Sequence, residues 1–147
     1  MITSLGVIAS LLFSAWQTRE LTRQTAINNG IAGAAAGYNS LERLHAVDSF
    51  IATHPWLYNH FYGGAPIPDD PEQRARVLAL VNMFADSIGY GLMTTTLAPA
   101  IQGYEGWREF ALSVRSGCPA LVQAVGANPG WYPTLAAHWN SHPESDS

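Results

Sequence analysis

The chain opens on a long uncharged segment, because Met1 to Thr18 contains no charged side chain. Its middle, Leu5 to Trp16, is almost wholly apolar, and the first charges, Arg19, Glu20 and Arg23, arrive together just after it. As a helix, the uncharged segment from Met1 to Thr18 would measure about 27 Å. This length is close to the ~30 Å of a bilayer's hydrocarbon core. We therefore expect residues 1–24 to form a membrane-anchor helix, with Trp16 at the membrane interface.

Two other interpretations of this segment stay open. A secretory signal peptide has a basic start and a cleavage site soon after its apolar run. No basic side chain precedes Leu5, and the nearest good small-residue stretch, Gly33 to Ala36, lies too far downstream. A buried or interface helix of a soluble assembly would also be apolar. If the segment is an anchor, the arginines that follow it favour a single pass through the inner (plasma) membrane with a cytoplasmic body.

Composition limits the rest of the chain. Its 147 residues suffice for one helical body, residues 25–140, with a polar tail, residues 141–147, that we expect to be disordered. Only 12% of the residues are charged, against a usual value of about 25%. The net charge is −4 and no basic run occurs, so nucleic-acid binding has no electrostatic support. Five Trp, six Tyr and five Phe with so little charge suggest a surface covered by lipid or by a partner.

Helical periodicity runs throughout the sequence, which predicts an all-α fold: a long N-terminal helix to about Thr53 and a small helical bundle. Asp70, Pro71 and Gln73 form the start signal of the second helix, which Ala98-Pro99 ends. Its apolar residues recur three and four apart: Val77, Val81, Phe84, Ile88 and Leu92. Further helices are expected over about residues 105–115, 119–125 and 133–139.

Small residues form a stripe in the middle of the first helix: Ala26, Gly30, Gly33 and Gly37. Their spacing of four, three and four puts them on one helical face, and Gly33 with Gly37 makes a GxxxG pair. Each glycine costs about 1 kcal/mol in an isolated helix, so a close neighbouring helix is the economical explanation. We expect this stripe to contact another helix, from a partner subunit or a second copy, and Trp16 to contact membrane lipid. A flexible hinge is the alternative.

An aromatic-rich loop follows His54-Pro55, where the first helix is expected to end. We expect the aromatic side chains of this loop and of the C-terminal segment to pack onto the second helix. They are Phe61, Tyr62, Trp107, Trp131 and Tyr132.

Several short motifs follow one another in a fixed order. They are Gln17-Thr18-Arg19-Glu20-Leu21, Pro55-Trp56-Leu57 with Phe61-Tyr62-Gly63, Arg74 with the run Val77 to Asp86, Trp107 to Phe110, Cys118-Pro119-Ala120-Leu121, and Asn128 to Pro133. This order resembles an uncharacterised bacterial family of short, N-terminally membrane-anchored helical proteins. The resemblance implies the fold and the anchor, and it implies no reaction, cofactor or catalytic residue.

Candidate catalytic groups are few. Glu42 and His45 have the Glu-x-x-His spacing of metal sites in helical bundles, with Asp48 one turn on and Asp86 on the next helix. A di-iron site needs two such motifs and two further glutamates, and only one motif is present.

The remaining polar residues have structural explanations. Cys118 stands at a helix start without an identifiable catalytic histidine, and Pro143 argues against one helix holding both His138 and His142. Asn82, Asp86 and Tyr90 are expected to form a buried hydrogen-bonded cluster. We expect no enzyme activity, no catalytic residue, no cofactor and no bound metal.

Three classes of function remain from the sequence. We favour a non-catalytic accessory or scaffold subunit of a larger membrane protein complex or homo-oligomer. A membrane-tethered ligand sensor, with the aromatic loop as a lid, is the alternative. A metal-dependent helical enzyme built around Glu42 and His45 is the third class.

Overall fold

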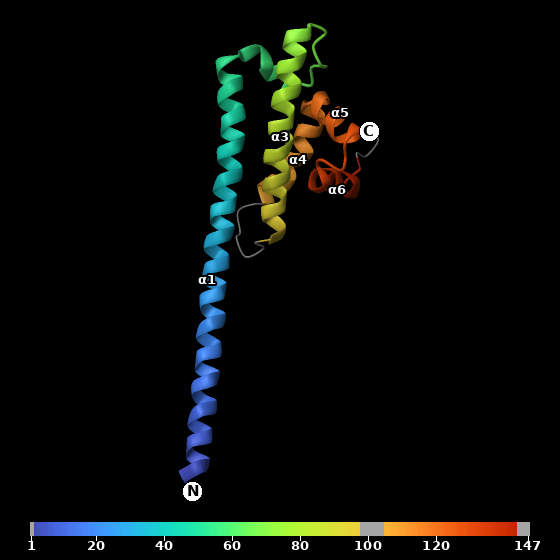
Figure 1. Cartoon of the computed structure of the whole chain (residues 1–147). Coiled ribbons are helices and arrows are strands. Elements are labelled where there is room, and N and C mark those ends of the chain that lie inside the picture. Colours follow the sequence, from blue (N-terminus) through green and yellow to red (C-terminus); the bar gives the residue numbers. More distant parts are fainter. Residues whose placement is uncertain (1, 98–104, 144–147) are drawn as a thin grey trace.

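The computed structural model describes residues 2–97 and 105–143, and all regular secondary structure in these ranges is helical (Figure 1). The elements are α1 (Ile2–Thr53), the 3-10 helix η1 (Pro55–Leu57), α2 (Tyr58–Phe61), α3 (Pro71–Leu97), α4 (Glu105–Gly117), α5 (Pro119–Ala127) and α6 (Pro133–Ser141). This confirms the all-α class, with a long N-terminal helix and a small helical bundle.

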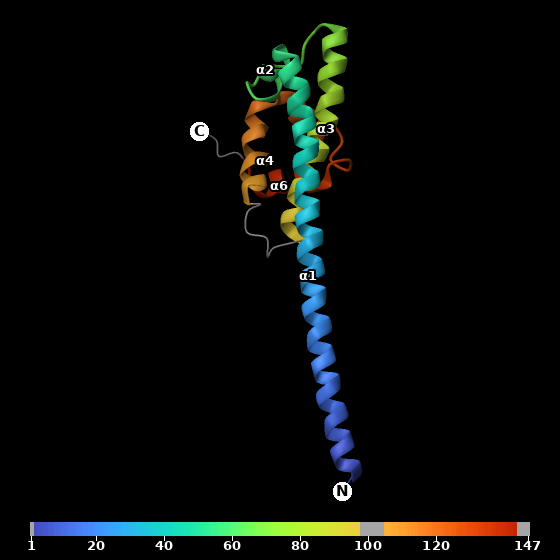
Figure 2. The same cartoon turned by 90° about the vertical axis from the view of Figure 1, so that its left-hand side faces the viewer.

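The central element of the body is α3. Helix α1 lies along one side of α3, whereas α4, α5 and α6 lie on the other side (Figures 1 and 2). The predicted apolar face of α3 is confirmed as the core, because all five of its residues are buried: Val77, Val81, Phe84, Ile88 and Leu92. Burial of side chains of this size stabilises the fold by about 1.5–3 kcal/mol each.

The predicted start of α3 is also confirmed. The Asp70 carboxylate accepts a hydrogen bond of 2.8 Å from the backbone N–H of Gln73, and Pro71 occupies the first helical position. This bond satisfies one of the backbone donors that the first turn of a helix leaves without a partner. The helix continues through Gly89 and Gly91 to Leu97. The predicted stop at Ala98-Pro99 lies outside the described residues.

Helix α1 has two unequal parts. Its C-terminal part packs against α3 and is buried at Gly37, Ser40, Val47 and Ile51. Its N-terminal part projects well beyond the body (Figure 1). At 1.5 Å per residue the whole 52-residue helix is about 78 Å long. We call residues 6–32 the free section of α1, because their large apolar side chains are exposed.

We expected an aromatic-rich loop after α1. The structure instead has two short helices there, η1 and α2. It packs into the core through Phe61, which is fully buried and meets Phe84 edge-on at 5.4 Å. The chain then turns at Gly64, whose φ of 73° favours glycine, and the Gly64 N–H donates to the Gly117 carbonyl at 2.8 Å.

The C-terminal helices are each slightly longer than the sequence predicted. Helix α4 extends to Gly117, α5 to Ala127 and α6 to Ser141. Ser141, which we assigned to the tail, donates its hydroxyl to the His138 carbonyl at 2.8 Å and closes the last turn of α6. Residues 144–147 of the predicted tail lie outside the described residues.

Candidate functional site

The free section of α1 exposes an unusual amount of apolar side chain. The exposed fraction is between 52 and 67% for nine large residues: Val7, Ile8, Leu11, Leu12, Phe13, Trp16, Leu21, Ile27 and Ile31. Scattered single apolar residues are normal on a protein surface, but a contiguous set of this size marks an interaction surface. Phe13 and Trp16, with ring centroids 6.0 Å apart, form an aromatic pair near its middle.

Three polar side chains of this section form hydrogen bonds within the helix. The hydroxyls of Thr18, Thr22 and Thr25 each donate to the backbone carbonyl four residues earlier, at 2.9 Å. A hydroxyl bonded in this way costs less to remove from water than one that loses its partner. These three threonines therefore add little to the cost of placing the helix in an apolar or interfacial environment.

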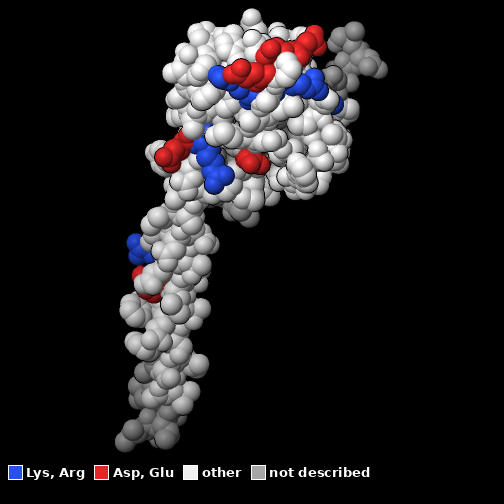
Figure 3. Space-filling view, turned by 45° about the horizontal axis from the view of Figure 1, so that its top comes forward, with Lys and Arg blue, Asp and Glu red and all other residues white. Residues whose placement is uncertain are grey.

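Charge is absent from the first part of this section. Arg19, Glu20 and Arg23 are its only charged residues, and none precedes them. In Figure 3 the far part of the projecting helix carries no coloured atoms, whereas most coloured side chains lie over the body. The uncharged helix ends at Thr18, so Arg19, Glu20 and Arg23 lie at the C-terminal end of the predicted anchor, residues 1–24.

The stripe of small residues is divided between the free section and the body. Ala26 and Gly30 are exposed, Gly33 is half-buried, and Gly37 is buried in the body. Helix α1 runs without interruption through the stripe. The residues beside Gly33 line a pocket of about 310 Å³ together with Tyr90 and Met93 of α3. The C-terminal end of the stripe thus has a neighbour in this same chain, whereas near its N-terminal end no described atom lies within 4 Å of an added Cβ at Gly30.

One helix among the described residues is long and apolar enough to cross a bilayer, and it is α3 over Pro71–Thr96. More than half of its most apolar window, 56%, is buried inside the body, as in the core helix of a globular domain. The described residues of α1, where we expected the anchor, do not meet the same criterion of length and hydropathy. By length and composition the support for a membrane span is therefore weak.

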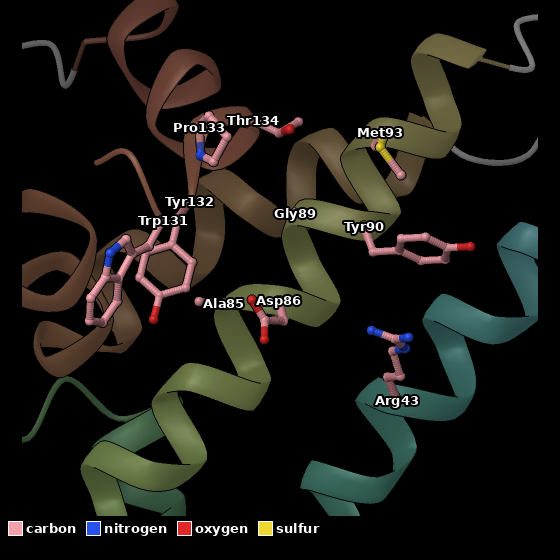
Figure 4. Close-up of a pocket in the computed structure, with 10 residues that line it drawn as sticks. All are labelled: Arg43, Ala85, Asp86, Gly89, Tyr90, Met93, Trp131, Tyr132, Pro133 and Thr134. Atoms are coloured by element: carbon pink, nitrogen blue, oxygen red, sulfur yellow. The ribbon is translucent and has the colours of Figure 1, made fainter. Parts of the chain in front are cut away.

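A pocket of about 250 Å³ opens between α1, α3 and the start of α6 (Figure 4). Its polar residues include Arg43 from α1 and Asp86 and Tyr90 from α3. The Arg43 guanidinium lies over the Tyr90 ring, 5.2 Å from its centroid. The Tyr132 hydroxyl donates to Asn82 Oδ1 at 2.8 Å, and burial followed by the negative charge of Asp86 raises the pKa of Tyr132.

Two sequence predictions are wrong at this pocket. Asn82 and Asp86 are exposed and Tyr90 is half-buried, so these residues do not form a buried cluster. Trp131 does not pack onto α3 as Tyr132 does, because 71% of its surface is exposed. The spacing of Asn82, Asp86 and Tyr90 in the sequence predicted that they lie along one side of α3. No sequence pattern predicted the position of the 128–132 turn, which brings Trp131 beside these residues.

The candidate metal and thiol residues are not assembled into a site. Glu42 and His45 are both exposed, and Asp48 accepts a hydrogen bond of 2.6 Å from the Tyr62 hydroxyl. Within residues 2–97 and 105–143, no three His, Cys, Asp or Glu side chains are grouped closely enough to hold a metal ion. Cys118 is fully buried, and this burial raises the pKa of its thiol to about 11, which disfavours the reactive thiolate.

The two C-terminal histidines are not both held by one helix, as the sequence predicted, because α6 ends at Ser141. His138 is in α6 and His142 caps its end, with ring centroids 4.7 Å apart. Each ring bonds a backbone carbonyl: His138 Nε2 that of Arg108 at 3.1 Å, and His142 Nδ1 that of His138 at 3.0 Å. The first bond links α6 to α4, and the second lies within the end of α6.

Comparison with protein-family models, with curated proteins and with solved structures found no match to this chain.

Proposed function

We propose that this chain is a non-catalytic, membrane-anchored accessory or scaffold subunit of a larger membrane protein complex. The free section of α1 is the observation that carries this proposal. It exposes nine large apolar side chains on a single helix that no other described element covers. The start of α1 lies in the inner membrane as a single span, and the body lies in the cytoplasm.

The cost of exposing apolar side chains to water favours a free section that is surrounded by lipid or by another protein. Full burial of one large apolar side chain is worth about 1.5–3 kcal/mol. The free energy that would be gained by burying all nine exposed side chains is therefore comparable with the whole stability of a small domain, about 5–15 kcal/mol. Lipid or a partner helix around the free section recovers this free energy.

The distribution of charge suggests that lipid surrounds one end of the free section and that a partner helix contacts the other end. The end before Arg19 has no charge and suits the hydrocarbon core. Arg19 and Arg23 follow on the side that becomes cytoplasmic under the positive-inside bias. Ala26 and Gly30 lie beyond them, on a face small enough for a partner backbone to approach closely.

The alternative function, a ligand sensor with the aromatic segment as a lid, has less support. Phe61 and Leu57 are fully buried, and Tyr62 meets Phe84 edge-on at 5.8 Å, so the aromatic segment is part of the core. A lid must leave the body to admit a ligand, and this segment would expose its core residues by doing so. The subunit proposal requires no such movement.

Membrane placement is tested by fractionation and by cysteine labelling in intact cells. We expect the chain to stay with the membrane through a high-salt wash and to leave it only in detergent. An introduced thiol, Asn140→Cys, lies on the exposed face of α6 and should resist an impermeant reagent until the cells are opened. The unmodified chain is the matched control, since its own Cys118 is buried. Release by salt alone contradicts the anchor, and labelling in intact cells contradicts the orientation.

Assembly is tested at the free end of the stripe. Gly30→Leu should remove co-purifying subunits or reduce the oligomeric size, because the new side chain separates two helix backbones. It should leave the body folded, since no atom lies within 4 Å of the position of an added Cβ. Asn28→Leu is the matched control, exposed in the same section and on another face of the helix. A Gly30→Leu protein that keeps its partners and its size favours the hinge.

A further inference from the structure

The pocket of Figure 4 has a floor that depends on a glycine. Ala85 and Gly89 of α3 form this floor, and an added Cβ on Gly89 would meet no atom within 4 Å. Open space therefore begins at the α3 backbone itself. Glycine lowers helix stability by about 1 kcal/mol relative to alanine, so its presence here keeps the pocket deep at a cost to α3.

The walls of the pocket are aromatic. Trp131 and Tyr132 stand on the α6 side and Tyr90 on the α1 side (Figure 4). The exposed face of Trp131 has no aromatic partner among the described residues. The electron-rich face of an aromatic ring attracts a cation, and Tyr90 already holds the Arg43 guanidinium in this way.

The pocket carries one charge of each sign, and the two are not paired. Asp86 makes no hydrogen bond or ion pair with any described residue, and Figure 4 shows it between Tyr132 and Arg43. Arg43 stacks on Tyr90 but has no carboxylate partner in the described part of the chain. A ligand with a single charge would satisfy one of these groups and meet a like charge at the other.

We propose that this pocket binds a small zwitterion, a molecule with an organic ammonium at one end and an anionic group at the other. The ammonium lies at Asp86 against the rings of Trp131 and Tyr132. The anionic group lies at Arg43, whose guanidinium offers a planar set of donors. A volume of about 250 Å³ lies just below the ~300–1,000 Å³ of most ligand pockets, so it suits only a very small molecule. This binding activity does not depend on the proposed role as a membrane subunit.

The test uses the full chain in a maltoside detergent, which has no choline headgroup, and glycine betaine as the probe. Two analogues isolate the charges: the tert-butyl analogue of betaine lacks the positive charge, and choline lacks the negative one. Calorimetry should show betaine binding at least about tenfold more tightly than either analogue, the factor that 1.4 kcal/mol represents. Trp131 makes tryptophan fluorescence a second readout.

Substitutions assign the two subsites. Asp86→Asn and Trp131→Ala should each weaken betaine about tenfold or more and abolish its advantage over the tert-butyl analogue. Arg43→Gln should instead abolish its advantage over choline. Gly89→Leu should abolish binding by filling the floor, and it should not unfold the chain, because the added side chain enters open space. Asp69→Asn is the matched control, an exposed acid outside the pocket.

Competition separates the sources of such a ligand. Displacement of betaine by soluble choline phosphate, but not by phosphatidylcholine in mixed micelles with the maltoside, indicates a free small molecule, and displacement by both indicates a lipid headgroup. Either result supports a zwitterion site. Displacement by neither overturns it, as does equal binding of betaine and its tert-butyl analogue. Unchanged affinity in a folded Asp86→Asn protein also overturns it, and so does a failure of betaine, choline phosphate and glycine to bind at millimolar concentrations.

Discussion

Replacing Gly91 with alanine tests the closest approach between helices in the core. Gly91 is buried in α3 beneath the indole ring of Trp107 from α4. An added Cβ would lie 2.5 Å from both Cε2 and Cε3 of that ring and closer still to Cδ2. Trp107 has no room to move away, because it is itself buried and meets Phe110 edge-on at 5.9 Å.

Two effects of opposite sign determine how much Gly91→Ala changes the free energy of unfolding. Glycine to alanine inside a helix gains about 1 kcal/mol of intrinsic helix stability. Overpacking a rigid core costs about 1–3 kcal/mol, and an overlap with three ring atoms belongs at or above the upper end. We therefore expect Gly91→Ala to lower the free energy of unfolding by about 2 kcal/mol. Gly89→Ala, two residues away in the same helix with no atom within 4 Å of its added Cβ, should raise it by about 1 kcal/mol.

Urea unfolding followed by circular dichroism measures both changes, and a double-mutant cycle assigns their cause. Trp107→Ala alone should cost about 3–5 kcal/mol, since it removes a buried aromatic ring. In that background Gly91→Ala should become stabilising, because the methyl group then enters the space that the ring has left. If Gly91→Ala is as stable as the parent, or destabilises equally with and without Trp107, the packing of α4 on α3 is not as described.

Three further predictions concern the body. Asp70→Ala should cost about 0.5–2 kcal/mol by removing the cap of α3, measured by urea unfolding. Tyr62→Phe should cost about 1.5–3 kcal/mol, because it removes a hydroxyl that donates to the Asp48 carboxylate between the aromatic segment and α1. Burial raises the pKa of the Cys118 thiol from an ordinary value of 9.0 to about 11, so this group alone should lower the free energy of unfolding by roughly 3 kcal/mol as the pH rises through that range. A pH series of unfolding curves should show this loss to be smaller in Cys118→Ala, and an unchanged loss would contradict the assignment.

The sequence predicted the elements that depend on local signals. The start of α3 was predictable because Asp70, Pro71 and Gln73 act within one helical turn, and the hydrogen bond from Gln73 to Asp70 confirms it. The buried face of α3 was predictable because Val77 to Leu92 repeat at the helical period. Such patterns need no knowledge of which element lies opposite.

The candidate site depended on tertiary contacts that no local pattern contains. Trp131 and Tyr132 are adjacent aromatic residues, yet Tyr132 is buried and Trp131 is exposed. The turn at 128–132 decides this difference, since Tyr132 must reach Asn82 on α3 and its neighbour then points elsewhere. Arg43 and Asp86 lie on separate helices, so their common pocket appears only once α1 packs on α3.

The small-residue stripe shows why a sequence cannot separate contacts within a chain from contacts between chains. The positions of α1 that face the body recur four and three apart, at Gly33, Gly37, Ser40, Leu44, Val47 and Ile51. Continuing the same spacing toward the N-terminus reaches Gly30 and Ala26, so the stripe and the body contact are one continuous seam. Helix α3, described to Leu97, reaches along this seam to the neighbourhood of Gly33. Leucine at Gly37 would therefore disturb the body itself, whereas Gly30 lies on the seam beyond it and is the position that distinguishes a partner helix from a hinge.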